Sequence, residues 1–180
     1  MIVVDDASEP ALPFASLRLK SRQGFQRACN RGLRAAKSDA VLFLNNDVTM
    51  TDAGWLDAIR RELRPGVLVG AQLREEEGHA EVDGRAEPYL DGWCVAGMRA
   101  DLKRIGGWDE SLVEPAYFGD NLLSLRARMA GMALVEARVG LRHLRGVTTA
   151  ELTVRLRHAY DLNLATYQLA VRESRALAPA

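Results

Sequence analysis

The sequence predicts one α/β domain with a mostly parallel central sheet, helices on both faces and an antiparallel extension in its second half. Two observations carry this prediction. Short apolar runs bounded by polar residues alternate, along the first half, with segments whose apolar residues recur at helical spacing. The length of 180 residues is also ordinary for one domain and sufficient to bury a core.

The first two strand candidates each end in a polar cluster. Ile2–Val4 leads into Asp5–Asp6, and Val41–Leu44 leads into Asn45–Asp47. Because Val41–Leu44 is uninterrupted and apolar, this strand is expected to be buried on both faces. Ligands of open parallel sheets bind at the carboxyl ends of the strands, so the two strands are expected to run parallel and to direct both clusters into one crevice.

The cluster of Asn45, Asn46 and Asp47 has two interpretations. Asn and Asp favour turns because their side chains bond their own backbone. Alternatively, the three side chains could hold Mg²⁺ or Mn²⁺ shared with a phosphate, because these cations prefer oxygen ligands and keep coordination positions for substrate phosphates. Taken alone, the cluster does not distinguish between the two.

The remaining elements follow from periodicity and from turn residues. A helix over 23–37 connects the first two strands and completes a strand, helix, strand unit. The most polar part of the chain, residues 72–90, predicts a surface excursion or an irregular hairpin. The other predicted elements are a connection over 9–21, helices over 53–63, 99–105, 120–129 (with Met129 inward) and 149–173, and strands over 67–71, 91–98, 133–137 and 139–143.

Composition excludes several classes of protein. The 24 basic residues balance the 24 acidic residues, so no overall field favours nucleic acid or an anionic membrane. No apolar run is long enough to span a bilayer, and no secretory signal is visible. Cys29 and Cys94 are too few for a disulfide scaffold and are expected to be buried thiols. These features predict a cytoplasmic protein.

Seven stretches follow one another in a characteristic order: Ile2–Ser8, Gly24–Ala36, Val41–Asp47, Asp91–Gly92 with the following strand, Ile105–Glu110, Asp120–Arg126 with Gly131, and His143 with Gly146 and Thr148. In this order they resemble the family 2 glycosyltransferases of the GT-A fold, especially their rhamnosyltransferase-like members. The resemblance covers residues 1–149 and implies a three-layer, nucleotide-diphospho-sugar transferase sandwich. Residues 150–180 are then expected to form a C-terminal helix packed on the same domain.

The resemblance also implies roles for individual residues. It places Asp5 or Asp6 at the nucleotide base, Asn30, Asn45 and Asn46 in the donor pocket, Asp47 and His143 at the metal, Asp120 as the catalytic base, and Asp91 and Trp93 on the acceptor side. Asp120 at a helix start suits a base because the helix dipole favours the ionised carboxylate, although Asp is also a common helix cap. His143 is equally compatible with simple packing.

The sequence departs from the family pattern in three ways. The family normally opens with another strand and helix before the strand at Ile2, so the chain is expected to be shortened there and to leave a sheet edge uncovered. The last helix, a second copy of the chain or a partner subunit is expected to cover it. Gly119 and Leu122 stand where acids are expected near the base. Finally, the motif of processive members is missing, which favours transfer of a single sugar.

The resemblance implies inverting, metal-dependent transfer of a sugar from a nucleoside diphosphate to the hydroxyl of an unknown acceptor, with Mn²⁺ or Mg²⁺ as cofactor. Two alternatives stay open. One is a catalytically weak or inactive relative that binds a nucleotide sugar or serves as a scaffold subunit. The other is a nucleotidyltransferase with a related sheet, although no glycine-rich phosphate loop lies near the amino end.

Overall fold

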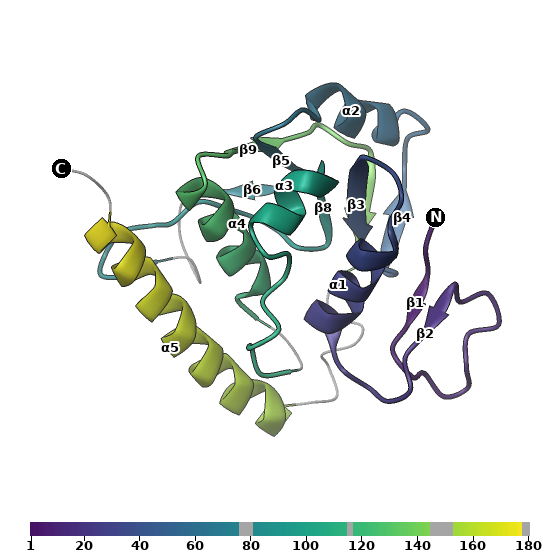
Figure 1. The fold of residues 1–180 in the computed structure, drawn as a ribbon, viewed down its shortest axis with the longest axis horizontal. Coiled ribbons are helices and arrows are strands. Elements are labelled where there is room, and N and C mark those ends of the chain that lie inside the picture. Colours follow the sequence, from purple (N-terminus) through teal and green to yellow (C-terminus); the bar gives the residue numbers. More distant parts are fainter. Residues whose placement is uncertain (76–80, 115–116, 145–152, 178–180) are drawn as a thin grey trace.

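The computed structural model describes residues 1–75, 81–114, 117–144 and 153–177, with only the backbone of 153–156. It is an α/β fold in which helices cover both faces of a central sheet (Figure 1). In chain order the elements are β1 (Val4–Asp5), β2 (Leu17–Arg18), α1 (Phe25–Ala35), β3 (Ala40–Leu44), β4 (Val48–Met50), α2 (Trp55–Glu62), β5 (Val67–Gly70), β6 (Leu73–Arg74), β7 (Tyr89–Leu90), β8 (Cys94–Met98), α3 (Arg99–Arg104), α4 (Gly119–Met129), β9 (Ala133–Glu136), β10 (Leu141–His143) and α5 (Thr153–Leu177).

The central sheet has the strand order β3-β8-β5-β9. β3 and β5 both pair antiparallel with β8, and β5 pairs parallel with β9. Three strands therefore share one direction and β8 opposes them, so the sheet is partly parallel as the α/β prediction requires. Side chains alternate between its faces: Leu68 packs with α1, α3 and α4, whereas Val67 and Val69 pack with Ile59 of α2. These are the two outer layers of the sandwich.

The first strand is not where the sequence analysis placed it. β1 was expected to lie parallel to β3 in one sheet, but among the described strands it pairs only with β2, inside the segment expected to be a connection. The Val3 carbonyl accepts hydrogen bonds from the amides of Ser16 and Leu17, which fixes this turn of chain against β1. The β1–β2 ribbon consequently lies beside α1, outside the central sheet (Figure 1).

β3 is also less buried than its apolar sequence predicts. Only Phe43 is buried, and Leu44 is 37% exposed. One edge of β3 pairs with β8, and its other edge pairs with no strand in the described part of the chain. Burial on both faces was therefore a wrong prediction, because an apolar run cannot reveal whether a neighbouring strand covers its second edge.

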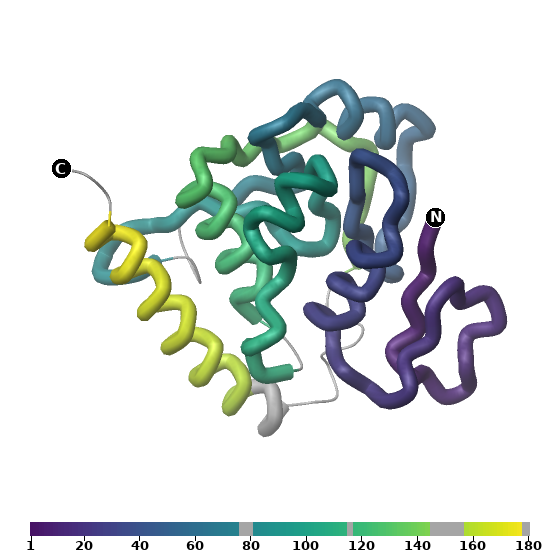
Figure 2. The backbone as a smooth tube through the Cα atoms, viewed as in Figure 1, coloured from purple at the N-terminus to yellow at the C-terminus, as the bar shows by residue number. Residues whose placement is uncertain are grey.

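The last helix does not cover that edge either. α5 packs on α4 through a cluster that includes Phe118, Leu122, Tyr167 and Val171. Figure 2 shows it on the side of the molecule opposite the N-terminal ribbon. Met129, predicted to face inward, is 54% exposed. The start of the helix predicted over 149–173 lies outside the described residues.

The polar excursion over 72–90 is a hairpin, as predicted, but part of it is buried. β6 and β7 pair antiparallel, and Val82, Tyr89 and Leu90 are almost fully covered. The buried Glu87 carboxylate binds Arg128 of α4 at 2.6 Å and Arg175 of α5 at 2.7 Å. Although burial opposes ionisation, these two guanidinium groups hold the pKa of Glu87 below its usual value. The hairpin thus ties α5 to the rest of the fold.

Candidate active site

A large cleft of about 2130 Å³ opens at the carboxyl end of β3. Its lining includes most of the residues singled out from the sequence: Asp6, Asn45, Asn46, Asp47, Asp91, Trp93, Asp120 and His143. They come from five separate parts of the chain, which the fold brings to one edge of the sheet. The volume exceeds that of an ordinary small-ligand pocket because the cleft also follows the whole length of β3.

Asp47 and His143 meet because of a pairing that the sequence did not predict. β4 follows Asp47 directly and pairs antiparallel with β10, with Val48 opposite His143. This register places His143 Nε2 3.0 Å from Asp47 Oδ1. The imidazole also stacks on Trp93, with ring centroids 5.3 Å apart and planes 6° from parallel. His143 is consequently fixed on both sides, against the carboxylate and against the indole.

This pair suits a cation that is shared with a substrate. Among the described residues, no group of three or more His, Cys, Asp or Glu side chains could enclose a metal ion. Asp47 and His143 together offer two ligands at the wall of an open cleft. Mg²⁺ and Mn²⁺ commonly bind through one or two protein ligands and complete their shell with phosphate oxygens and water. The donor set therefore fits a divalent cation carried on a diphosphate.

Asp120 lies in the first turn of α4 and faces the same cleft. Its Oδ2 accepts a hydrogen bond from the Gly92 amide at 3.0 Å, and its Oδ1 accepts one from the Asn121 amide, also at 3.0 Å. Burial, with the nearby charge of Asp91, raises the pKa of Asp120 above its usual value. A carboxylate with a raised pKa is a stronger base, which is what proton abstraction from a hydroxyl requires.

The predicted acceptor-side residues are engaged with protein groups. Asp91 forms a forked ion pair with Arg74, with Nη2 to Oδ2 at 3.1 Å and Nε to Oδ1 at 3.3 Å. Arg74 also lines the cleft. Asp91 therefore holds Arg74 at the wall of the cleft, while Trp93 supports the ring of His143.

The two acids at the end of β1 have different surroundings. Asp5 is buried, and it accepts hydrogen bonds from the amides of Ser8 and Leu12 and pairs with Arg18, which together lower its pKa to about 2. It does not line the cleft. Asp6 does, and its two oxygens accept the Gln23 and Gly24 amides at 2.7 Å. Of the two candidates for base recognition, only Asp6 lines the cleft.

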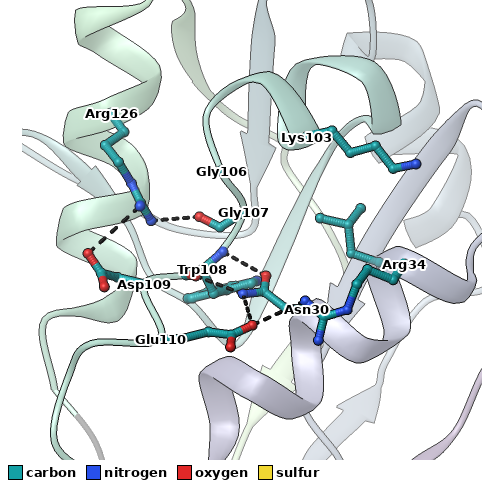
Figure 3. A pocket seen from close by; sticks show the side chains of 10 residues that line it. Asn30, Arg34, Lys103, Gly106, Gly107, Trp108, Asp109, Glu110 and Arg126 are labelled. Carbon is teal, nitrogen blue, oxygen red and sulfur yellow. Dashed lines mark hydrogen bonds and ion pairs between the residues drawn. The ribbon is translucent and has the colours of Figure 1, made fainter.

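Asn30, expected in the donor pocket, is instead a buried clamp beside a smaller pocket of about 320 Å³ (Figure 3). Its Oδ1 accepts a hydrogen bond from the backbone amide of Trp108 at 2.9 Å. Its Nδ2 donates to the Trp108 carbonyl and to Glu110 Oε1, both at 2.8 Å. Because both ends of the amide are used within the protein, Asn30 holds Trp108 in the core and does not contact the large cleft.

The Gly106–Gly107 pair explains why this clamp can close. Both residues have positive φ, at 83° and 64°, a conformation that side chains rarely permit. A Cβ on Gly107 would also lie 2.4 Å from Asn30 Oδ1. Glycine is therefore required both by the turn after α3 and by the approach of the amide. The turn directs Trp108 between Phe25 and Phe43, which it meets edge to face.

The clamp makes a prediction about stability. Asn30→Leu leaves the buried Trp108 amide and carbonyl without partners, so the free energy of unfolding is expected to fall by about 2–4 kcal/mol. Urea denaturation followed by tryptophan fluorescence measures this change. Arg34→Leu, one turn further along α1, is the control, because its exposed pair with Glu110 contributes at most about 1 kcal/mol. Equal losses of unfolding free energy in both variants would contradict the stabilising role of the hydrogen bonds between Asn30 and Trp108.

The sequence of residues 1–105, more than half of the chain, matches the profile described as Glycosyl transferase family 2. The chain belongs to this family. No curated protein sequence matches it significantly.

Two solved glycosyltransferase structures have a similar fold. The mannosyltransferase PcManGT from Pyrobaculum calidifontis, in complex with GDP-Man and Mn²⁺, superposes with a TM-score of 0.59 at 18% identity, over 99% of this chain and 66% of that one. GalNAc-T7 with UDP, GalNAc and Mn²⁺ gives 0.52 at 16%, over 71% and 31%. The chain thus spans slightly under two thirds of the first relative and about a third of the second. These likenesses confirm the predicted GT-A fold.

Three polar residues of this family 2 chain escaped the sequence analysis. Arg74 was assigned to a solvated excursion, and Gln26 and Asn121 were given no role, yet all three line the cleft. For Gln26 a signal existed. It is a polar residue on the inward face of α1, one turn before Asn30 and two turns before Leu33. Nothing in the sequence distinguished Asn121, because its burial depends on how α4 meets α1.

Proposed function

We propose that the chain is an inverting, metal-dependent glycosyltransferase that moves one sugar from a nucleoside diphosphate to an acceptor hydroxyl. One observation carries the proposal: the Asp47–His143 pair and the Asp120 carboxylate line the same cleft, although they come from different elements. A cation site and a base are the two groups that direct displacement at a sugar phosphate requires.

The proposed mechanism assigns one task to each group. Asp47 and His143 hold the divalent cation, whose chemistry is to take up the charge that develops on the leaving diphosphate. Asp120 accepts the proton of the attacking hydroxyl, and the Gly92 amide keeps its carboxylate oriented. Attack from the side opposite the diphosphate inverts the anomeric carbon. Asp6, Asn45 and Asn46 border the nucleotide, and Arg74, Asp91 and Trp93 border the acceptor.

The relatives support this assignment of substrate class and metal. Both solved structures carry Mn²⁺, one with GDP-Man and the other with UDP and GalNAc. The test is release of nucleoside diphosphate from a panel of UDP-, GDP- and dTDP-sugars with Mn²⁺, in the presence of candidate acceptors. Nuclear magnetic resonance of the product then reports whether the anomeric configuration has inverted. Retention of configuration would contradict direct displacement.

A binding module without turnover is the second candidate. Gly119 in place of an acid before Asp120, and the structural use of Asp5, favour it. Such a module would bind nucleotide sugar with Mn²⁺ but release no diphosphate in the panel above.

The two free cysteines support a reducing compartment, and the cytoplasm is the proposed location. None of the helices in the described ranges has the length and apolar character to cross a membrane.

The assembly and the domain are also proposals. We propose that residues 1–149 and the C-terminal helix form one domain, joined through Glu87, and that a second copy or a partner subunit covers the free edge of β3. Unpaired strand edges readily recruit another chain, so the purified protein is expected to be larger than one chain. Light scattering coupled to size exclusion chromatography measures its mass. A strictly monomeric species would contradict the proposal that a second copy of the chain covers this edge.

A further inference from the structure

Gln26 and Asn121 are buried polar residues at the border of the cleft, and one side-chain atom of each is unsatisfied. Gln26 is 3% exposed and Asn121 is 4% exposed. Among the described residues, Gln26 Oε1 and Asn121 Nδ2 have no hydrogen-bond partner, and both residues line the cleft. An unsatisfied buried polar atom costs about 1–3 kcal/mol, so two such atoms at one site indicate a missing partner.

The two side chains lie at the first turn of α4, which carries the proposed base. Asn121 directly follows Asp120 in the first turn of α4. The Gln26 amide rests against the same turn, because a Cβ on Gly119 would lie 2.8 Å from Gln26 Nε2. Glycine at position 119 therefore makes room for Gln26 beside Asp120. The side-chain amides of Gln26 and Asn121 thus both lie at the helical turn that carries Asp120.

Four backbone amides near Gln26 are already bonded to carboxylates of the protein. At the start of α1, Asp6 accepts the Gln23 and Gly24 amides. The carboxylate of Glu114 accepts hydrogen bonds from the backbone amides of Phe25 and Gln26. With these amides already bonded, Gln26 Oε1 is left as an acceptor that needs a donor from elsewhere.

The chemistry of the two atoms selects the kind of partner. Gln26 Oε1 needs a donor, and Asn121 Nδ2 needs an acceptor. A phosphate only accepts hydrogen bonds and an ammonium group only donates them, whereas a hydroxyl does both. We infer that Gln26 and Asn121 form a subsite that binds sugar hydroxyls beside Asp120 and determines which sugar the enzyme uses. This inference rests on the proposed function.

The test compares nucleotide sugars with the same diphosphates lacking the sugar. Calorimetric titration uses UDP-, GDP- and dTDP-sugars and their diphosphates with Mn²⁺, on the wild type, Gln26→Met and Asn121→Leu. These substitutions keep approximate volume and remove the hydrogen-bonding atoms. Each variant is expected to weaken sugar binding about 5- to 10-fold, the effect of one buried hydrogen bond, and to leave diphosphate affinity within about twofold. Gln168→Leu on α5 is the matched control.

A second arm identifies the source of the sugar. Methyl glycosides are titrated into each protein saturated with diphosphate and Mn²⁺. If the variants lose affinity only for nucleotide sugars, the subsite binds the donor sugar. If they lose affinity only for methyl glycosides, it binds the acceptor sugar. Both results support the inference. Melting temperatures are expected to stay within about 4 °C of the wild type, which confirms that the variants fold.

Three results would overturn the inference. If neither variant changes the affinity for any sugar, the two amides are satisfied by fixed water. If the affinities for diphosphate and nucleotide sugar fall equally, the residues shape the cleft and do not bind the sugar. If the wild type binds no diphosphate, the proposed function is wrong and the subsite is rejected with it. The diphosphate arm on the wild type thus separates failure of the function from failure of the subsite.

Discussion

Asp47→Ala is expected to abolish the Mn²⁺-dependent part of nucleoside diphosphate binding and to lower the rate of sugar transfer at least about 100-fold. In the proposed site, Asp47 is one of the two side chains that would bind the cation, and its Oδ1 lies 3.0 Å from Nε2 of the other, His143. A bound cation contributes several kcal/mol to stabilising the leaving group, and each 1.4 kcal/mol corresponds to about tenfold in rate.

Calorimetric titration with and without Mn²⁺ measures the binding, and diphosphate release measures the rate. Asp39→Ala is the control, because Asp39 precedes the same strand at its opposite end and is exposed. It changes the net charge by the same amount and is expected to leave the metal effect unchanged. Retained Mn²⁺ dependence in Asp47→Ala would show that the cation binds elsewhere or is not required.

Asp120→Asn is expected to lower kcat by about 10²- to 10⁴-fold while leaving donor affinity nearly unchanged. The amide keeps the size of the carboxylate and can still accept the Gly92 hydrogen bond, but it cannot take a proton. Rates and affinities are measured under the same conditions as for Asp47→Ala. A variant that retains its rate would remove Asp120 from the mechanism.

The raised pKa of Asp120 gives this prediction a pH dependence. The base acts when ionised, so the wild-type rate is expected to fall as the pH drops through a value above the ordinary pKa of an aspartate. The contribution of Asp120 to folding stability changes with pH in the opposite direction to the rate. A carboxyl whose pKa is raised by folding stabilises the protein below its unfolded pKa and loses that contribution as the pH rises through the folded value.

Above its folded pKa, therefore, ionised Asp120 opposes folding, and Asp120→Asn is expected there to melt at the same temperature as the wild type or slightly higher. Thermal unfolding at several pH values measures this. The exposed Asp161→Asn on α5 is the control for loss of one charge and is expected to change neither rate nor melting temperature. A fall in stability together with the rate would indicate that Asp120 has a structural role.

Asn30 and Asp5 show that a correct family does not establish what each polar side chain bonds to. Both lie in stretches that resemble the family, and both contain groups that could bind a nucleotide. In the structure their hydrogen bonds are used up by Trp108 and by the loop after β1. Residue type and spacing cannot show whether a polar atom is already bonded, because its partner can lie about 80 residues away in the sequence, as Trp108 does from Asn30.

The sequence by itself determined the family, the α/β class and most of the helices. α1, α2 and α3 begin and end within a few residues of their predicted bounds, because periodicity and the turn residues Gly106 and Gly107 are local signals. The polar cluster after β3 was recognisable for the same reason. It required only neighbouring residues to identify the end of an apolar strand.

Only the tertiary structure decided which of these residues meet. Asp47 reaches His143 through the pairing of β4 with β10, and Gln26 reaches the turn of Asp120 through the contact of α1 with α4. It also decided that β3 keeps a free edge and that α5 packs on α4. Strand pairing and helix packing join residues far apart in the chain, and their register depends on side chains from both partners, so no single segment contains that information.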